Sequence, residues 1–383
     1  MIALILLLIL LVYLVTIAHL IVGFNAVKTF HPNDKIPKTF FAIVVPFRNE
    51  SANLPQLLES IKNLKYPIDL FEIILVDDFS EDDSVRQIYN WRMENGTFQT
   101  TLLENIRLSN SPKKDAISRA IPIVTNQWIV TTDADCIVLE NWLSTLDLYI
   151  QGHDVDMIVG GVVYDCNKSF LHHFQQLDLM SLQGATLGSF GLGLGFMCNG
   201  ANFCYTKSLF QELNGFVGNN KIASGDDVFL LQKAMKSHSD KVHFLKSKAT
   251  IVHTKPESSW ADLFEQRVRW ASKTSSYQSV FGKDLAVIVF GGNLALVVGC
   301  GLWVINYPLS VVGCRLSGGD LVGILFVLKF VMDFMLLYKT NRFLRTKRMH
   351  YLFLSSLVYP FFCVSVAVFS WFGSYDWKGR SLR

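Results

Sequence analysis

An uncharged apolar stretch at the N-terminus constrains the fold more than any other feature of this sequence. Residues 2–24 contain no Asp, Glu, Lys or Arg, and about 20 apolar residues are enough for a helix to cross the hydrocarbon core of a bilayer. A cleaved signal peptide begins with basic residues and ends at a small-residue cleavage site, and this stretch has neither. The sequence therefore predicts a retained transmembrane helix.

Three further apolar stretches lie near the C-terminus, at residues 285–314, 321–338 and 351–372. The first is too long for one straight span and contains Pro308, so we expect one span plus an interfacial piece, with a re-entrant or double crossing as the alternative. The basic segment 339–350 separates the last two stretches and is typical of a cytoplasmic loop. Four spans result, and a second crossing within 285–314 would move the basic tail from outside to inside.

The orientation of the first span follows from its flanking charges. No charged residue precedes it, whereas Lys28, Lys35 and Lys38 follow it. Basic residues favour the cytoplasmic side of a membrane. We therefore expect a multi-pass integral protein of the cell membrane whose middle part is cytoplasmic.

The composition excludes several classes of protein. Half of the 383 residues are hydrophobic and 17% are charged, against about 25% charged residues in ordinary soluble domains, so the chain is not a purely soluble protein. The formal net charge is only +3, which gives no basic field for a nucleic-acid partner. The seven cysteines are scattered and include no C-x-x-C, so neither a zinc knuckle nor a disulfide framework is indicated.

Between the apolar ends, residues 38–282 alternate β-rich runs with helical patterns. The runs are residues 40–46, 71–78, 128–135 and 156–164, and apolar residues recur at helical spacing between the first two, as at Leu54, Leu57, Leu58 and Ile61. Such alternation is typical of an α/β fold with a parallel sheet and flanking helices. We expect three parts: an N-terminal transmembrane helix (1–27), a cytoplasmic domain (38–282) and a C-terminal membrane region (283–383) with about three spans.

Acidic residues follow two of these predicted strands. Asp77 and Asp78 end one strand, and Asp133-Ala134-Asp135 ends another. Ligands of open α/β sheets bind beyond the carboxyl ends of the strands, although Asp is also a common turn and helix-cap residue. Alternation along an extended segment would put Asp133 and Asp135 on one side, where their oxygens suit Mg²⁺ or Mn²⁺ carrying a diphosphate.

Further motifs complete an ordered set. Pro46-Phe47-Arg48-Asn49-Glu50 follows the first strand, Asp226-Asp227 opens a helical pattern, and Gln266-Arg267-Val268-Arg269-Trp270 comes later. With these motifs the chain resembles the membrane-embedded family 2 glycosyltransferases, a group with a GT-A (Rossmann-like, mostly parallel) catalytic fold that includes ceramide glucosyltransferase and cellulose, chitin and hyaluronan synthases. The signature D, D-x-D, E/D-D, Q-x-x-R-W is matched by Asp78, Asp133–Asp135, Asp226–Asp227 and Gln266–Trp270, over about 240 residues.

The resemblance implies roles on the donor side. Pro46, Asn49 and Glu50 would border the nucleobase, and Asp78 would hold the base and ribose. Lys113 and Lys114 are similar to a Lys-rich stretch near the nucleotide, with a solvated helix start as the alternative. Asp133 and Asp135 would hold the divalent cation, Mg²⁺ or Mn²⁺, that bridges the diphosphate, and Arg269 would neutralise the diphosphate.

On the acceptor side the resemblance assigns the catalytic base to Asp227, with Asp226 as its neighbour. The family usually has Glu-Asp where this chain has Asp-Asp, which leaves the choice between these two carboxylates open. Helix-dipole stabilisation of acids in a first turn is the structural alternative. Gln266 and Trp270 share a helical face with Arg269 and would contact the acceptor. Asn199 and Asn202 are acceptor-side candidates, with a turn plus helix cap as the alternative.

The resulting prediction is an inverting glycosyltransferase that moves a sugar from a nucleotide-sugar, a UDP-sugar by the resemblance, to a membrane lipid or lipid-linked acceptor. A processive polysaccharide synthase, acting on a glycan acceptor and extruding it through the spans, is the alternative. A non-catalytic membrane scaffold is a second alternative, but it would not need the intact carboxylates and the Gln-Arg-Trp residues. A nucleotidyltransferase also uses an α/β sheet with acidic metal ligands, but the Q-x-x-R-W helix would have no role in it. The glycines of residues 187–203 lack the Gly-Lys-Ser/Thr of a phosphate-binding loop.

Overall fold

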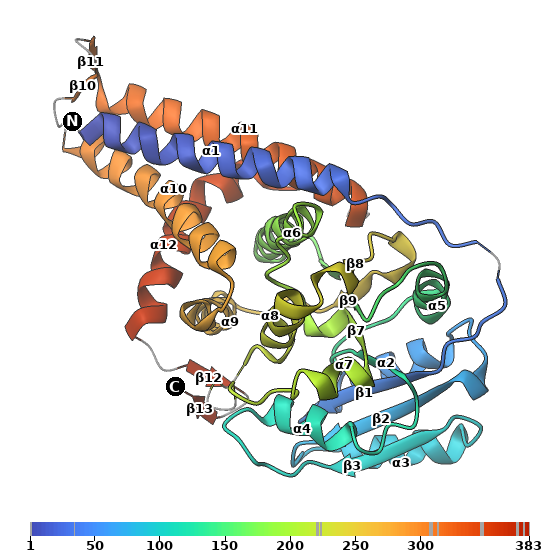
Figure 1. The fold of residues 1–383 in the computed structure, drawn as a ribbon. Coiled ribbons are helices and arrows are strands. Elements are labelled where there is room, and N and C mark those ends of the chain that lie inside the picture. Colours follow the sequence, from blue (N-terminus) through green and yellow to red (C-terminus); the bar gives the residue numbers. More distant parts are fainter. Residues whose placement is uncertain are drawn as a thin grey trace.

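The computed structural model describes residues 2–33, 35–219, 222, 224–305, 309–311, 314–344, 348–372, 375–377 and 380–382. Within them a seven-stranded sheet lies beside a bundle of long helices (Figure 1). The sheet has the order β3-β2-β1-β4-β7-β5-β8. Its strands are β1 (Phe41–Phe47), β2 (Phe71–Asp77), β3 (Thr100–Glu104), β4 (Trp128–Thr131), β5 (Met157–Val159), β7 (Phe203–Thr206) and β8 (Val242–Phe244).

The sheet is mostly parallel, as predicted. β1 pairs in parallel with β2 and β4, and β2 pairs in parallel with β3. β7 runs antiparallel between β4 and β5, which hydropathy alone did not predict. The predicted strand at 156–164 is two strands: β5 belongs to this sheet, whereas β6 (Val162–Tyr164) pairs with β9 (Val252–Thr254) in a separate ribbon.

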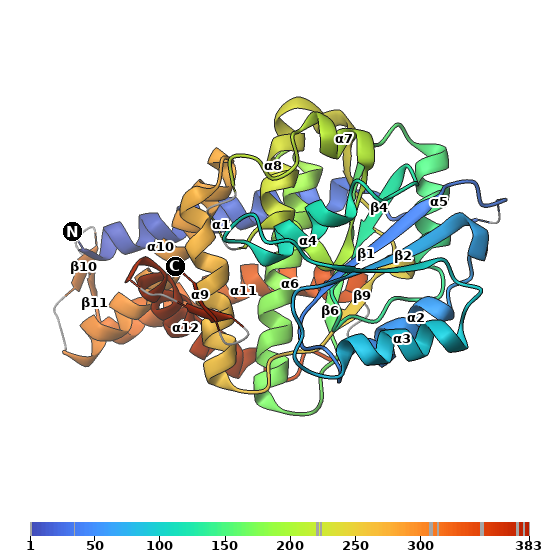
Figure 2. The same ribbon diagram turned by 90° about the horizontal axis from the view of Figure 1, so that it is seen from below.

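Helices cover both faces of the sheet. They are α2 (Leu54–Lys62), α3 (Ser84–Glu94), α4 (Pro112–Ala120), α5 (Trp142–Gly152), α6 (Phe170–Gly191), α7 (Lys207–Glu212), α8 (Asp226–Ser237) and α9 (Trp260–Ser272). Alternate residues of β1 face opposite layers: Ile43 packs in a core with α2, α3 and α5, and Val44 packs in a core with α4 and α8. Figure 2 shows α2 and α3 together below the sheet. Two-sided burial explains why the strands are continuous apolar runs.

Among the described residues, four helices are long and apolar enough to cross a membrane: α1 (Ile2–Ala26), α10 (Val280–Val304), α11 (Gly318–Leu344) and α12 (Leu352–Phe372). The sequence predicted the same number of membrane spans. The described part of the stretch 285–314 contains one long helix, α10, and the start of a short hairpin, β10 (Leu309–Val311) with β11 (Cys314–Leu316). Pro308 and parts of the basic loop and the tail lie outside the described residues.

The N-terminal helix is packed directly on the domain that contains the sheet. α1 crosses α6 at three glycines, where a Cβ on Gly188 would lie 2.4 Å from the Leu20 carbonyl oxygen, and one on Gly191 only 1.8 Å from the Gly23 carbonyl oxygen. Small residues allow such close backbone contact between helices. Gly188 and Gly191 therefore serve the packing of α6 against α1.

An ion pair lies among the apolar helices. Lys329 Nζ is 2.5 Å from Asp333 Oδ2 one turn along α11, and the Tyr13 hydroxyl of α1 donates to Asp333 Oδ1 at 2.5 Å. Charged side chains in a membrane region are costly unless they are paired inside the protein. These contacts neutralise the charges and join α1 to α11.

Candidate active site

The predicted acidic residues meet in one large cavity beside the carboxyl ends of β1, β2 and β4. Its volume is about 870 Å³, within the usual range for ligand sites. The parallel strands end at the same edge, so loops that are distant in sequence contribute side chains to one place. The predicted residues that line it are Pro46, Glu50, Asp78, Lys113, Asp133, Asp135, Asn199, Asp226, Asp227, Gln266, Arg269 and Trp270.

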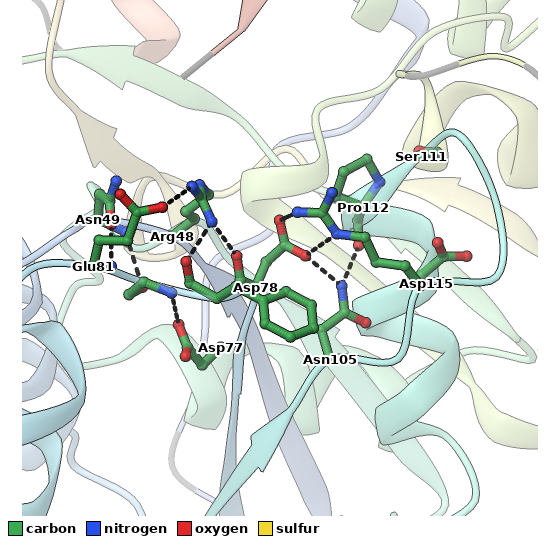
Figure 3. Close-up of polar contacts among 12 residues, drawn as sticks. Arg48, Asn49, Asp77, Asp78, Glu81, Asn105, Ser111, Pro112 and Asp115 are labelled. Carbon is green, nitrogen blue, oxygen red and sulfur yellow. Dashed lines mark hydrogen bonds and ion pairs between the residues drawn. The ribbon is translucent and has the colours of Figure 1, made fainter. Parts of the chain in front are cut away.

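Asp78 lies at the end of the cavity formed by the loops after β1 and β2 (Figure 3). Its carboxylate is held by Arg107, with Nε 3.0 Å from Oδ1 and Nη2 2.7 Å from Oδ2, and accepts from Asn105 Nδ2 at 2.8 Å. A bidentate guanidinium contact fixes the plane of a carboxylate. Asp78 is therefore oriented before any ligand arrives.

The two loops are tied to each other by Arg48 and Asn49. Arg48 donates to the main-chain oxygens of Asp78 and Phe79 and to Glu81 Oε1, and Asn49 Oδ1 accepts from the Glu81 N–H at 2.8 Å. Figure 3 shows Arg48 and Asn49 beside Glu81. Asn49 does not line the cavity; it braces the loop that carries Pro46 and Glu50.

The adjacent lysines of α4 have different surroundings. Lys113 Nζ lies in the cavity 2.5 Å from Asp133 Oδ1 and 3.5 Å from Asp226 Oδ2. Lys114 is buried and donates to the main-chain oxygens of Asn219 and Ile222. Burial lowers the pKa of Lys114 to about 8. The structure brings only Lys113 to the cavity; Lys114 is neither in its lining nor at a solvated helix start.

Asp133 and Asp135 both line the cavity, but they do so from a turn rather than from an extended segment. The Cys136 N–H donates to the Asp133 main-chain oxygen, and Asp135 Oδ2 accepts from Thr254 Oγ1 at 3.3 Å. The described residues contain no group of three or more His, Cys, Asp or Glu that would hold a metal ion. Asp133 and Asp135 offer carboxylate oxygens, which are the ligands that Mg²⁺ and Mn²⁺ prefer. Such ions usually complete their coordination shell with water and phosphate oxygens. The pair fits a cation of this kind bound together with a diphosphate.

Asp226 and Asp227 begin α8 as predicted, and their environments differ. Asp227 Oδ2 accepts from the Gly200 N–H at 2.9 Å, and its Oδ1 accepts from the Val228 N–H and lies 4.0 Å from Lys273 Nζ. Burial acts to raise the pKa of Asp227, but Lys273, Lys113 and the two N–H groups outweigh it and lower this pKa below its usual value. Burial raises the pKa of Asp226, and Asp227 adds to this effect. The surroundings of Asp227 thus favour its ionised form, and those of Asp226 oppose it.

The helix α9 presents Gln266, Arg269 and Trp270 to the cavity. Between them in sequence, Arg267 is buried at 5% exposure, with Nε 2.5 Å from Asp178 Oδ2 of α6. The Arg267 guanidinium also donates to Gln266 Oε1 and lies 4.3 Å from the centre of the Trp270 ring. Arg267 therefore holds two predicted site residues in position.

The two asparagines predicted on the acceptor side lie in different environments. Asn199 lines the cavity, and its side chain caps the short turn after it by accepting from the Ala201 N–H. Asn202 is buried in the core, where Nδ2 donates to the main-chain oxygens of Gly161 and Thr250 and Oδ1 accepts from Trp142 Nε1. All these bonds of Asn202 are structural, and it is not part of the cavity lining.

Sequence reasoning missed the cations that orient the acidic residues: Arg48, Arg107, Arg267 and Lys273. Arg107 follows β3, a strand that was not predicted, although the run Thr-Thr-Leu-Leu before Glu104 has β-strand character. Arg267 and Lys273 lie in or just after the recognised motif. Nothing in their local sequence indicates which carboxylate they would meet.

Comparisons with known proteins agree with this geometry. The family model for glycosyl transferase family 2 matches residues 42–213, and that for glycosyl transferase family group 2 matches residues 128–375. The curated glycosyltransferase GlyG of Streptococcus pneumoniae is 27% identical over 205 residues, which are 53% of this chain and 59% of GlyG. The probable glycosyltransferase YdaM of Bacillus subtilis is 25% identical over 267 residues, 65% of this chain and 60% of YdaM. The chain thus spans about 60% of the length of these two relatives.

A solved structure shares the fold along nearly the whole chain. The mannosyltransferase PcManGT from Pyrobaculum calidifontis, in complex with GDP-Man and Mn²⁺, superposes with a TM-score of 0.56 at 14% identity, covering 97% of this chain and 99% of that one. One of the two family models alone covers well over half of the sequence. The chain therefore belongs to glycosyl transferase family group 2, contains a region that matches glycosyl transferase family 2, and has a GT-A-like fold.

Proposed function

We propose that this enzyme is a membrane-embedded, inverting glycosyltransferase that moves one sugar from a nucleotide-sugar to a hydroxyl group of a membrane lipid. One observation carries the proposal: the cavity that holds Asp78, Asp133 and Asp227 continues between two apolar helices, where Val289 of α10 and Val366 of α12 belong to its lining. An acceptor that diffuses in the bilayer would enter from that side. A water-soluble acceptor would not require that part of the cavity to be lined by two apolar helices.

The arrangement of charges supports the donor side. The nucleotide would lie against Asp78 and the loop after β1, and Arg269 would face the diphosphate. Asp133 and Asp135 would hold the divalent cation; when bound, such a cation neutralises negative charge on the diphosphate as the sugar departs. The structure of PcManGT is a complex with GDP-Man and Mn²⁺, and the resemblance of this chain indicates a UDP-sugar, so both nucleotides belong in a donor screen.

Transfer itself requires one bond to form and one to break. The acceptor oxygen attacks the anomeric carbon while the bond from that carbon to the β-phosphate oxygen breaks, and the bonding pair leaves with the nucleoside diphosphate. Asp227 takes the hydroxyl proton as general base. Attack opposite the leaving group inverts the configuration of the anomeric carbon.

The packing of the helices supports a cytoplasmic location of the site. The C-terminal ends of α1 and α11 meet at the catalytic domain, where Lys339 donates to Asn25 at 3.0 Å, and α10 leaves the domain soon after α9. The basic residues Lys28, Lys35 and Lys38 lie at this same end, which the positive-inside rule assigns to the cytoplasm.

The function is tested with the purified protein in lipid nanodiscs, a panel of UDP-, GDP- and dTDP-sugars, Mg²⁺ or Mn²⁺, and a total membrane lipid extract. We expect one lipid product that carries a single added sugar, identified by mass spectrometry. A ladder of sugars would instead establish a processive synthase. Absence of turnover with every donor, despite binding of a nucleotide, would contradict the enzymatic proposal and favour a scaffold.

The metal assignment predicts a specific loss. Asp133→Ala and Asp135→Ala should each weaken Mn²⁺-dependent binding of the donor nucleotide by about 10–100-fold, the range seen when groups around a metal are removed. Calorimetric titration with and without a chelator measures the effect. Asp69→Ala is a matched control, because Asp69 is exposed and outside the cavity. Unchanged cation-dependent binding in both variants would remove these residues from the site.

A further inference from the structure

Two apolar spaces lead away from the catalytic end of the cavity. The first, here called the outer groove, is the part of the 870 Å³ cavity that lies between α10 and α12. It is lined by Ala286, Val289 and Phe290 of α10 and by Phe362, Val366 and Ala367 of α12. Both helices have the length and hydropathy of membrane spans. The groove is therefore lined by two helices that could lie in the hydrocarbon region.

The second space, here called the inner cavity, has a volume of about 230 Å³ and lies among α1, α6, α10, α11 and α12. Apolar side chains dominate its lining, among them Ile17, Leu20, Leu177, Ala185, Leu285 and Leu337. An apolar cavity of about 150 Å³ is already large enough for a benzene ring. Lys329 and Asp333 also border the inner cavity, but they are paired with each other, so they add no net charge.

The two spaces adjoin each other. Met197 and Thr274 line both of them, and their chain neighbours Cys198 and Lys273 line the catalytic end, where Lys273 Nζ is 4.0 Å from Asp227 Oδ1. The two spaces also share a wall along α6, α10 and α12, because both are lined by Asp178, Leu182, Tyr277, Ala286, Val289 and Tyr359. The polar reaction centre is therefore bordered by two adjoining apolar spaces, here called branches.

We propose that the acceptor is a lipid with two hydrocarbon chains, one in the outer groove and one in the inner cavity, with its hydroxyl head group at Asp227. This inference rests on the proposed lipid glycosyltransfer and deepens it. A chain gains no hydrophobic free energy on moving from bilayer to protein, so selection comes from contact with the walls. A one-chain lipid, such as a polyprenol or a monoacyl lipid, would leave one branch without partner atoms and lose those contacts.

The number of chains can be read from the product. The purified wild-type protein in nanodiscs is supplied with a total membrane lipid extract and the active nucleotide-sugar, and the glycosylated lipid is fragmented by tandem mass spectrometry. We expect two hydrocarbon chains per product molecule. A product with one chain would overturn the inference while leaving lipid glycosyltransfer intact, whereas a sugar ladder or no lipid product would contradict the proposed function itself.

Two variants test whether both branches are occupied. Ala185→Phe fills the inner cavity and Ala367→Phe fills the outer groove; each should lower kcat/KM for the lipid acceptor at least tenfold and leave the Kd of the donor nucleotide unchanged. Val368→Phe on α12 is the control, because Val368 is exposed and lines neither space. Wild-type transfer by Ala185→Phe would show that no chain occupies the inner cavity.

A smaller substitution tests the inner cavity in case the Ala185→Phe variant does not fold. Ser356→Leu adds bulk to the inner cavity from the opposite helix, α12, and should reduce lipid transfer in the same way. Retained donor binding shows that either variant is folded. If both variants bind the donor and transfer at the wild-type rate, the two-chain acceptor is excluded.

Discussion

Asp227→Asn is expected to reduce the rate of sugar transfer by about 10²–10⁴-fold, the usual contribution of a general base, while the donor nucleotide still binds. Asparagine has almost the shape of aspartate, and its single side-chain oxygen can keep one of the two hydrogen bonds that the Gly200 and Val228 N–H groups now donate to the two oxygens of Asp227. It cannot take the proton of the acceptor hydroxyl. Steady-state kinetics and donor titration on the same preparation separate the two effects.

Asp226→Asn is the matched control for that experiment. Asp226 lies 3.5 Å from Lys113 and burial raises its pKa, whereas Lys273, Lys113 and two N–H groups lower the pKa of Asp227, so the site favours the ionised form of Asp227 more than that of Asp226. We therefore expect the smaller loss of rate for Asp226→Asn. If Asp227→Asn transfers like the wild type and Asp226→Asn does not, the two roles are exchanged. Near-normal rates in both variants would exclude this pair as the source of the base.

Removal of the Arg267 charge is expected to have the second large effect. Arg267→Met leaves Asp178 as a buried carboxylate without its guanidinium partner, since both side chains are only 6% exposed. Breaking one half of a buried ion pair costs about 3–5 kcal/mol of stability. Thermal unfolding in nanodiscs should therefore show a lower Tm, and transfer should fall because Gln266 and Trp270 lose the contacts that hold them.

A double variant separates the loss of stability from the loss of activity. Replacing both members of a buried pair by apolar residues is often neutral for stability, so Asp178→Leu combined with Arg267→Met should recover most of the Tm. Transfer should remain low, because Trp270 still lacks the guanidinium that lies against its ring. Full recovery of transfer in the double variant would show that Arg267 acts on the fold alone.

Local sequence patterns were sufficient for the framework of the protein. The length and apolarity of residues 2–24 indicated α1, and continuous apolar runs indicated β1, β2 and β4, because both signals depend on neighbouring residues only. The acidic residues at strand ends were predicted to share a site because parallel strands end at one edge. The structure brings Asp78, Asp133 and Asp227 to one cavity.

The tertiary structure decided which polar residues meet. Lys113 and Lys114 are adjacent in sequence and equally basic, yet Lys113 contacts Asp133 and Lys114 contacts main-chain oxygens more than 100 residues away. The partners of Arg267 and Asn202, Asp178 and Trp142, are distant in sequence in the same way. Hydropathy and periodicity report how a segment is buried, whereas an ion pair or a hydrogen bond depends on where two segments cross. The sequence by itself therefore determined the elements and the chemistry available to them, and only the packing of the elements decided which side chains face the cavity.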